Sequence, residues 1–291
     1  MLDAADHVGL MHVWAGFQWV FGTRGRFEEW GRAAEQALFH SRQAGRADFF
    51  HGLTGALIAG PRPADEAAQT LEITLGDHHN LVSAKAYLLA MLGHFDEAWT
   101  MATAANRQHR EMTGKKRNTD TLGDIAGLAG DYEEAARQHR LYCDSLEEAG
   151  RLNILSTHGP ILGRYLALLG RYEEAEPLAQ LGRELGDEED VVTQAFWRQV
   201  QALVLTHCGE HEEAERLARE AVARIEQTDA LNFQGDALCD LATVLEQAGR
   251  AEEARAVLEE ALTRYERKKN VAMVAQVRQR FGASEDAVRL V

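Results

Sequence analysis

A six-residue pattern recurs along this chain and limits the folds that it can adopt. In its clearest copy the pattern reads Gly-Arg-Tyr-Glu-Glu-Ala, from Gly170 to Ala175. From Gly93 onward the copies are separated by 37 to 40 residues. A regular period of this length is typical of a solenoid, in which similar helical units stack on one another. The other copies begin at Gly25, Gly93, Gly130, Gly209 and Gly249.

Each copy has the chemistry of a turn between two helices. Glycine tolerates the left-handed backbone that ends many helices. The two acidic residues then fall in the first turn of the next helix, where exposed N–H groups favour negative charge. The final alanine is small enough for two antiparallel helices to approach, and Leu162, Leu166 and Leu169 precede Gly170 at helical spacing. The pattern therefore predicts an all-α fold of helix–turn–helix repeats.

The interval from Gly25 to Gly93 is 68 residues, about two repeats, which predicts a hidden copy between them. The segment from Pro61 to Ala67 fits this place, and the total is seven repeats. No linker interrupts them, so we expect a single repeat domain over residues 1–291. The expected repeats cover about 5–44, 48–74, 80–111, 117–148, 152–186, 190–227 and 231–268, followed by a capping helix at 270–280.

Three residues depart from the pattern. Trp30 stands where the other copies have alanine, so we expect the first helix pair to open or rotate around the indole. Pro160 is expected near the start of its helix, where proline is tolerated. Pro177 lies about one turn into a helix, which predicts a kink or a cost of ~3 kcal/mol.

Composition excludes several classes of partner and site. The net charge of −15 argues against binding to nucleic acid or to an anionic membrane. Cys143, Cys208 and Cys239 are isolated, with no disulfide framework or CxxC metal motif, so a reducing cytoplasm is expected. No signal peptide is recognised at the start, and the apolar stretch Val13 to Phe21 is too short to span a bilayer.

No residue cluster predicts catalysis, a cofactor or a metal. The paired glutamates recur in successive repeats, as helix starts do, whereas a catalytic pair is needed once. His207 and His211 have a metal-binding spacing, but Gly209 interrupts the helix between them. The segment Thr113 to Arg117 lacks the first glycine of a phosphate loop. We expect a protein that is not an enzyme. The alternative is a small-molecule pocket between repeats that uses His207 or the pair Asp120 and Asp124.

The small residues of the repeats resemble the framework of tetratricopeptide repeats. The first residues of this framework are Gly163, Ala202 and Ala242, followed twelve residues later by Ala175, Ala214 and Ala254 and then by Ala221 or Ala261. The resemblance implies a right-handed superhelical solenoid. The period is longer than the usual one, and the proline that closes many such repeats is missing.

A narrower resemblance covers most of the chain. The segments 190–198, 228–238 and 265–270 resemble the C-terminal repeat region of bacterial signalling proteins that carry a class III adenylate/guanylate cyclase domain or an AAA-type ATPase domain. The segments 16–45 and 60–67 resemble earlier repeats of that region. The resemblance implies a regulatory or sensor module, with cyclase or ATPase domains as partners in the same chain or another. The catalytic domains themselves are absent from this sequence.

The concave groove is the default binding surface of such a superhelix. Inward positions taken from the tetratricopeptide framework mix aromatic, acidic and basic groups, which suits a peptide better than a long polyanion. They are Trp19, Phe49, Tyr87, Arg117, Asp120, Asp124, Arg164, Phe196, Gln199 and Asp236. A second candidate face on one helix comprises Gln194, Trp197, Arg198 and Gln201, with a Trp–Arg pair of the kind that anchors interfaces. The alternative for that face is a tryptophan buried between repeats, with the arginine reaching water.

Together these observations predict a non-enzymatic module that binds a peptide or protein segment in the groove, in bacterial signal transduction or regulation. An assembly scaffold that forms homo-oligomers and a small-ligand sensor remain as alternatives. The sequence does not choose an oligomeric state.

Overall fold

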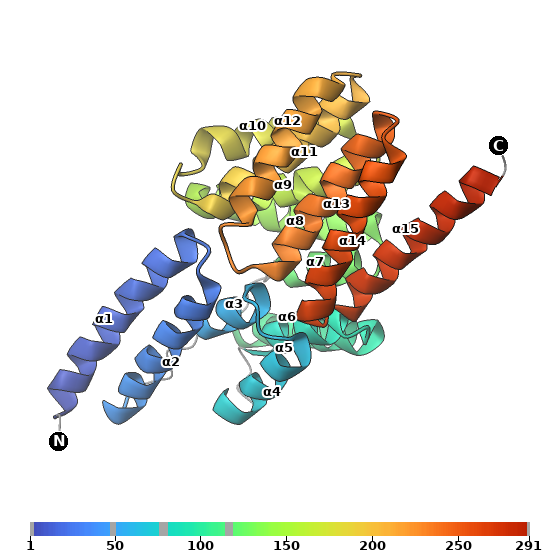
Figure 1. Ribbon diagram of the computed structural model, residues 1–291. Coiled ribbons are helices and arrows are strands. Elements are labelled where there is room, and N and C mark those ends of the chain that lie inside the picture. The colour runs from blue at the N-terminus through green and yellow to red at the C-terminus, as the bar shows by residue number, and fades with distance from the viewer. Residues whose placement is uncertain (1–2, 47–50, 76–80, 114–118, 290–291) are drawn as a thin grey trace.

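The computed structural model describes residues 3–46, 51–75, 81–113 and 119–289, and these ranges form fifteen α-helices and no strand (Figure 1). Consecutive helices pack in pairs and stack into a solenoid, so the predicted all-α repeat fold is confirmed. The helices are α1 (Ala4–Thr23), α2 (Phe27–Gln43), α3 (His51–Ala59), α4 (Ala64–Leu75), α5 (Val82–Met91), α6 (Phe95–Thr113), α7 (Thr121–Leu128), α8 (Tyr132–Glu148), α9 (Leu152–Leu168), α10 (Tyr172–Leu185), α11 (Val191–His207), α12 (His211–Ile225), α13 (Leu231–Gln247), α14 (Ala251–Lys268) and α15 (Val271–Arg289).

The recurring glycines end helices by adopting a left-handed backbone. The six glycines that open the repeated pattern have φ between 64° and 90°. At Gly170 the backbone N–H bonds to Ala167 O at 3.0 Å, and the N–H of Arg171 bonds to Leu166 O at 2.8 Å. These bonds satisfy carbonyls that the end of α9 would otherwise leave free. The next helix starts with its two glutamates in the first turn, as the sequence predicts.

The small residues of the pattern lie where paired helices touch. The pattern-closing alanines Ala135, Ala175, Ala214 and Ala254 are fully buried. Leucines and valines from neighbouring helices surround them in contiguous cores. Repetition of one contact therefore builds most of the interior.

Trp30 is accommodated by glycines of the neighbouring helices. A Cβ at Gly55 would lie 2.7 Å from Trp30 Cη2, and one at Gly52 would lie 2.7 Å from Trp30 Nε1. Gly22 of α1 also faces the indole, at 3.7 Å. The absence of side chains at these three glycines leaves room for the indole.

The expected place of Pro160 is wrong. The residue lies inside α9, which begins at Leu152 immediately after the turn at Gly150, so the helix extends well ahead of the proline. Pro177 lies inside α10, as expected. The error arose because the helix start depends on the Gly150 turn, which is not a copy of the repeated pattern.

The two ends of the solenoid meet. Asp229, between α12 and α13, accepts hydrogen bonds from the backbone N–H groups of Phe27 and Glu28 at 2.8 Å each and so caps α2. Gly25, with its positive φ, lies against Thr228, because a Cβ there would be 2.2 Å from Thr228 Cγ2. The first repeat is therefore anchored to a turn about two hundred residues away.

Lys268 makes the second contact between the ends. Its side chain is fully buried at the end of α14, and its ammonium donates to Leu57 O at 2.9 Å, Gly60 O at 2.7 Å and Arg62 O at 2.8 Å. Burial lowers the pKa of Lys268 to about 7. The carbonyls at the C-terminal end of α3 oppose this effect, because they favour the charged form. Figure 1 shows α3 next to the lower ends of α13 and α14.

The first residues of α15 pack against other helices, and the helix then extends away from the rest of the molecule (Figure 1). Ala272 of α15 belongs to the core built by α5 and its neighbours, while Val277 belongs to the core around α13 and α14. The helix runs from Val271 to Arg289, nine residues beyond the expected end at residue 280.

We expect Lys268→Met to lower the free energy of unfolding by about 2 kcal/mol, because three buried carbonyls lose a charged donor. Chemical denaturation measures this change. Lys269→Met is the matched control, since Lys269 is about half exposed and pairs with Asp65 at the surface. Equal effects of the two substitutions would show that the buried ammonium does not hold the ends together.

Candidate functional site

Four helices bring polar side chains together on the inner face of the solenoid. Tyr87 comes from α5, Asp124 from α7, Arg164 from α9 and Asp236 from α13. Burial raises the pKa of Tyr87 well above its usual value, and the charges of Asp124, Asp236 and Asp120 raise it further. The structure therefore gathers five of the predicted groove residues within electrostatic reach of one another.

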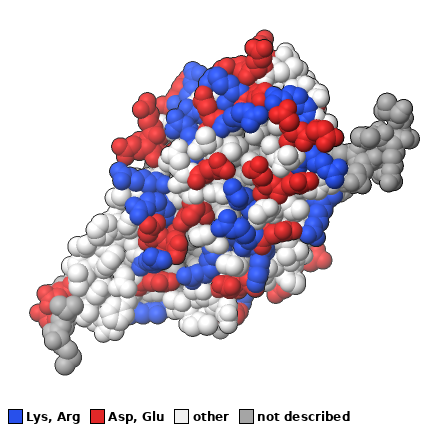
Figure 2. Space-filling view, viewed as in Figure 1, with Lys and Arg blue, Asp and Glu red and all other residues white. Residues whose placement is uncertain are grey.

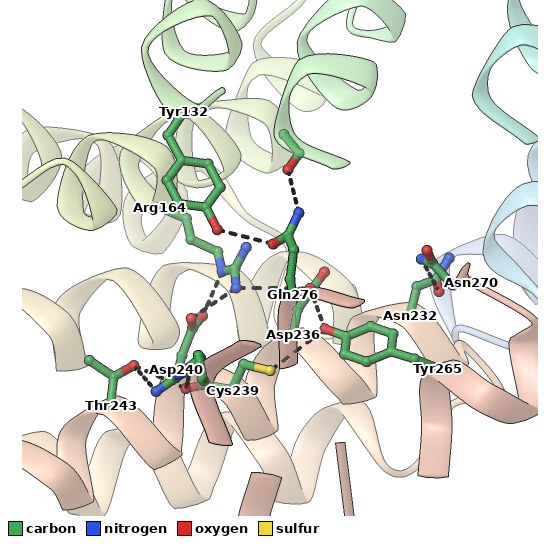
Figure 3. A network of polar contacts seen from close by, with 12 residues as sticks. Tyr132, Arg164, Asn232, Asp236, Cys239, Asp240, Thr243, Tyr265, Asn270 and Gln276 are labelled. Carbon is green, nitrogen blue, oxygen red and sulfur yellow. Dashed lines mark hydrogen bonds and ion pairs between the residues drawn. The ribbon is translucent and has the colours of Figure 1, made fainter. Parts of the chain in front are cut away.

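Arg164 is held by acidic groups of α13. Its guanidinium donates to Asp240 through Nε at 2.7 Å and through Nη2 at 2.9 Å (Figure 3). Asp236 Oδ1 lies 3.8 Å from the same guanidinium and accepts a hydrogen bond from Tyr265 Oη at 2.7 Å. The bidentate pair joins two repeats that are not neighbours in the chain. Asp240 also neutralises most of the positive charge of Arg164.

A side chain of α15 closes one end of this network. Gln276 Nε2 donates to the carbonyls of Gly127 at 3.1 Å and Leu128 at 2.8 Å, and Tyr132 Oη donates to Gln276 Oε1 at 3.1 Å (Figure 3). These bonds satisfy carbonyls at the C-terminal end of α7. The last helix thus forms part of the wall of the inner face.

The other end of the inner face is acidic and aromatic. We call Tyr87, Asp120, Asp124, Tyr165 and Asp236 the aspartate–tyrosine cluster. Burial raises the pKa of Asp124 to about 6, against the effect of a nearby histidine, and the neighbouring aspartates raise it further. Burial likewise raises the pKa of Tyr165. The cluster therefore carries carboxylates in a place where charge is poorly solvated.

A histidine lies close to each of the carboxylates of Asp120 and Asp124. His139 Nε2 is 3.4 Å from Asp124 Oδ1, and His158 Nε2 is 3.9 Å from Asp120 Oδ2. His139 stacks on Tyr165 with ring centroids 5.2 Å apart. It fits there because residue 123 is glycine, where a Cβ would lie 2.5 Å from the imidazole.

The predicted residues of α11 lie in the interior. Trp197 is only 8% exposed, and the guanidinium of Arg198 lies over its ring at 4.0 Å. Arg198 also donates to Gln194 O at 2.6 Å and pairs with Glu220 at 3.3 Å. The structure thus gives this face the buried-tryptophan arrangement that was the alternative in the sequence analysis. The other predicted residues of this helix, Gln194, Phe196 and Gln199, are buried as well.

The remaining predicted residues lie elsewhere. Trp19 is 69% exposed on α1, at the N-terminal end of the solenoid and apart from the cluster. Phe49 and Arg117 fall outside the described residues.

Sequence reasoning missed several members of the inner face. Tyr132, His139, His158, Tyr165 and Asp240 belong to it but were not predicted. Asp240 lies one helical turn after Asp236, so helical spacing could have indicated it. Tyr165 is adjacent to Arg164, and that spacing does not place two side chains on one face. Gln276 gave no signal, because its position depends on where α15 lies.

Within the ranges that the structure describes, no three His, Cys, Asp or Glu side chains are arranged to hold a metal. His207 instead stacks on Tyr172, with ring centroids 4.1 Å apart. No described helix is both long and apolar enough to cross a membrane.

Comparisons with known proteins agree with this architecture. Residues 193–267 match the family model for the tetratricopeptide repeat. No curated protein matches the sequence. The crystal structure of the APC/C hetero-tetramer Cut9–Hcn1 is similar, with a TM-score of 0.60 and 12% identity, over 89% of this chain and 48% of that chain. This chain therefore spans about half the length of that structure.

Two further structures are similar. NprR in complex with its cognate peptide NprX has a TM-score of 0.56 and 14% identity, over 98% of this chain and 88% of that chain. BtubC (BKLC) from P. vanneervenii has a TM-score of 0.46 and 19% identity, over 72% and 90%. The Cut9–Hcn1 and NprR structures and the matched repeat model establish a tetratricopeptide-like solenoid.

Asp124→Asn should change how stability depends on pH. A carboxyl group whose pKa rises from 3.8 to about 6 on folding binds more protons in the folded state, so it lowers stability as pH rises from about 4 to 6. The amide removes this loss, and we expect the variant to gain up to about 3 kcal/mol over the wild type above pH 6. Denaturation from pH 4 to pH 7.5 measures it.

Asp144→Asn is the control, because Asp144 is exposed on α8. A constant difference between Asp124→Asn and the wild type across this pH range would show that Asp124 is well solvated.

Proposed function

We propose that this protein is a non-enzymatic interaction and sensor module that binds a peptide or protein segment along the inner face of its solenoid. The observation that carries the proposal is the aspartate–tyrosine cluster, which collects side chains from four repeats on one surface. A structural core of this fold is served by alanine and leucine, as in the repeated contacts. Polar and aromatic groups that converge on a concave surface are instead typical of a binding site.

Two structural neighbours support the proposal. NprR was solved with a cognate peptide, and Cut9 was solved in a hetero-tetramer with Hcn1. Both share the solenoid fold with this chain. A solenoid presents a long inner surface, and an extended segment can contact several repeats at once.

The biological setting that we propose is bacterial signal transduction or regulation. It rests on the resemblance of segments 190–198, 228–238 and 265–270 to the repeat regions of cyclase and ATPase signalling proteins. In this setting, occupancy of the inner face would be relayed to catalytic domains in the same chain or in a partner.

A photo-crosslinking experiment tests the site. Replacement of Tyr87 by p-benzoylphenylalanine places a reactive group in the aspartate–tyrosine cluster, and the same replacement at Ile73 gives a control on α4, where the side chain is 78% exposed. We expect a random octapeptide library to crosslink at position 87 at least tenfold more than at position 73, as measured by mass spectrometry. Equal labelling, or none at either position, would contradict a peptide site on the inner face.

A second candidate function is self-assembly through α1. Four large apolar side chains of this helix are at least 41% exposed, and the end of the molecule that it forms shows few charges besides the acidic tip (Figure 2). The rest of the visible face is densely covered with both signs of charge. Uncharged apolar patches of this kind mark association sites. The four residues are Val13, Phe17, Trp19 and Val20.

If α1 mediates assembly, the double substitution Phe17→Asp and Trp19→Asp should weaken self-association at least tenfold, because it places charge in the apolar face. Light scattering over a concentration series measures the dissociation constant. Ile73→Asp is the control, as an isolated exposed apolar residue on α4. A wild-type protein that stays monomeric at every concentration would eliminate this candidate.

A further inference from the structure

We propose that the ligand is anchored on the inner face by a cationic group, a primary ammonium or a guanidinium, which binds between Asp120 and Asp124 and contacts Tyr87 and Tyr165. This inference rests on the proposed function and specifies its chemistry.

Within the residues that the structure describes, the carboxylates of Asp120 and Asp124 have few side-chain partners. Asp120 is the N-cap residue of α7, yet its side chain makes no capping hydrogen bond. A histidine nitrogen lies 3.9 Å from Asp120 Oδ2 and another lies 3.4 Å from Asp124 Oδ1. Asp120 is 38% exposed and Asp124 19% exposed, so a ligand can reach both.

No internal cation balances these groups in the described part of the chain. Arg164 is the arginine nearest to the cluster, and Asp240 holds it by two hydrogen bonds. Burial lowers the pKa of His158, which favours its neutral form. Asp236 lies 3.8 Å from the Arg164 guanidinium, so the negative charge that attracts a cation is mainly that of Asp120 and Asp124.

The tyrosines suit the same kind of ligand. Tyr87 and Tyr165 are partly buried, and among the described residues neither hydroxyl makes a hydrogen bond. Their hydroxyl oxygens can accept from an ammonium, and their rings can contact a cation by the cation–π interaction. The carboxylates and the aromatic rings thus both favour a cationic ligand.

His139 is the independent observation that points to a missing partner. Its side chain is fully buried, neither ring nitrogen makes a hydrogen bond, and Nε2 is directed at Asp124 from 3.4 Å. Buried polar atoms are rarely left without partners, and those that are require a ligand, a water or another explanation. A cation on the outer side of Asp124 would fix the carboxylate between itself and the imidazole.

A bound metal ion fits this geometry less well. Within the described ranges, no group of three potential ligands is close enough to coordinate one. An organic cation needs carboxylates and an aromatic surface, and the aspartate–tyrosine cluster supplies both.

Defined peptide libraries test the inference. Octapeptides with acetylated and amidated ends carry lysine, arginine or norleucine at one fixed position and random residues elsewhere. A fourth library has norleucine and a free amino terminus, and spermidine is titrated separately. Binding is measured by fluorescence polarisation for the wild type, for the double variant Asp120→Asn and Asp124→Asn, and for the control variant Asp144→Asn with Asp187→Asn, whose residues are exposed.

We expect at least tenfold tighter binding of a cationic library than of blocked norleucine peptides, and a loss of at least tenfold in the Asp120→Asn, Asp124→Asn variant alone. That variant should melt no lower than the wild type, because the amides remove buried charge. The lysine, arginine and free-terminus libraries distinguish a side chain from an amino terminus as the source of the cation.

The other outcomes distinguish a failure of the cationic anchor from a failure of the proposed peptide-binding function. Peptides that bind equally with norleucine or lysine, and equally to the double variant, would overturn the cationic anchor while the peptide-binding function stands. Binding of spermidine alone, abolished in the double variant, would keep the cationic site and overturn the peptide function. If no probe binds the folded wild type, both proposals are wrong.

Discussion

The inner face of this protein exists because the two ends of the solenoid are fastened together. Repetition along the chain fixes only how each helix pair packs on the next. Asp229 capping α2, and Lys268 donating to three carbonyls near the end of α3, add contacts between residues about two hundred positions apart. These contacts are directional, so they fix the curvature of the solenoid more tightly than a sliding apolar contact would. The distance between α5, α7 and α13 across the inner face depends on this curvature.

The buried polar and charged groups of the inner face contribute little to the stability of the fold or lower it. Desolvation of an ion pair such as Arg164 with Asp240 often cancels its attraction, so the pair is weak evidence of a role in stability. Burial of Asp124 and the open hydrogen-bonding capacity of His139 lower stability further. We infer that these groups are retained for the binding role proposed above.

The sequence predicted the helical hairpins well, because their signals are local. Glycines with positive φ, acidic first turns and buried alanines recur at one period, and each is explained by its nearest neighbours in the chain. Errors occurred where the local pattern stops. Pro160 was placed near a helix start because the Gly150 turn is not a copy of the motif. The glycines of α1 and α3 that lie against Trp30 are likewise outside the repeated pattern.

The candidate site was predicted only in part, for a related reason. Tyr87, Asp124, Arg164 and Asp236 occupy inward positions of successive helices, and a family framework supplies those positions. It cannot tell which inward positions remain accessible. Phe196 and Gln199 have the same register, but neighbouring helices bury them. His139 and Gln276 come from other surfaces and reach the site through packing across repeats. In a repeat protein, periodicity therefore predicts the scaffold, whereas the residues that break the period and the contacts that close the solenoid determine the chemistry of its inner face.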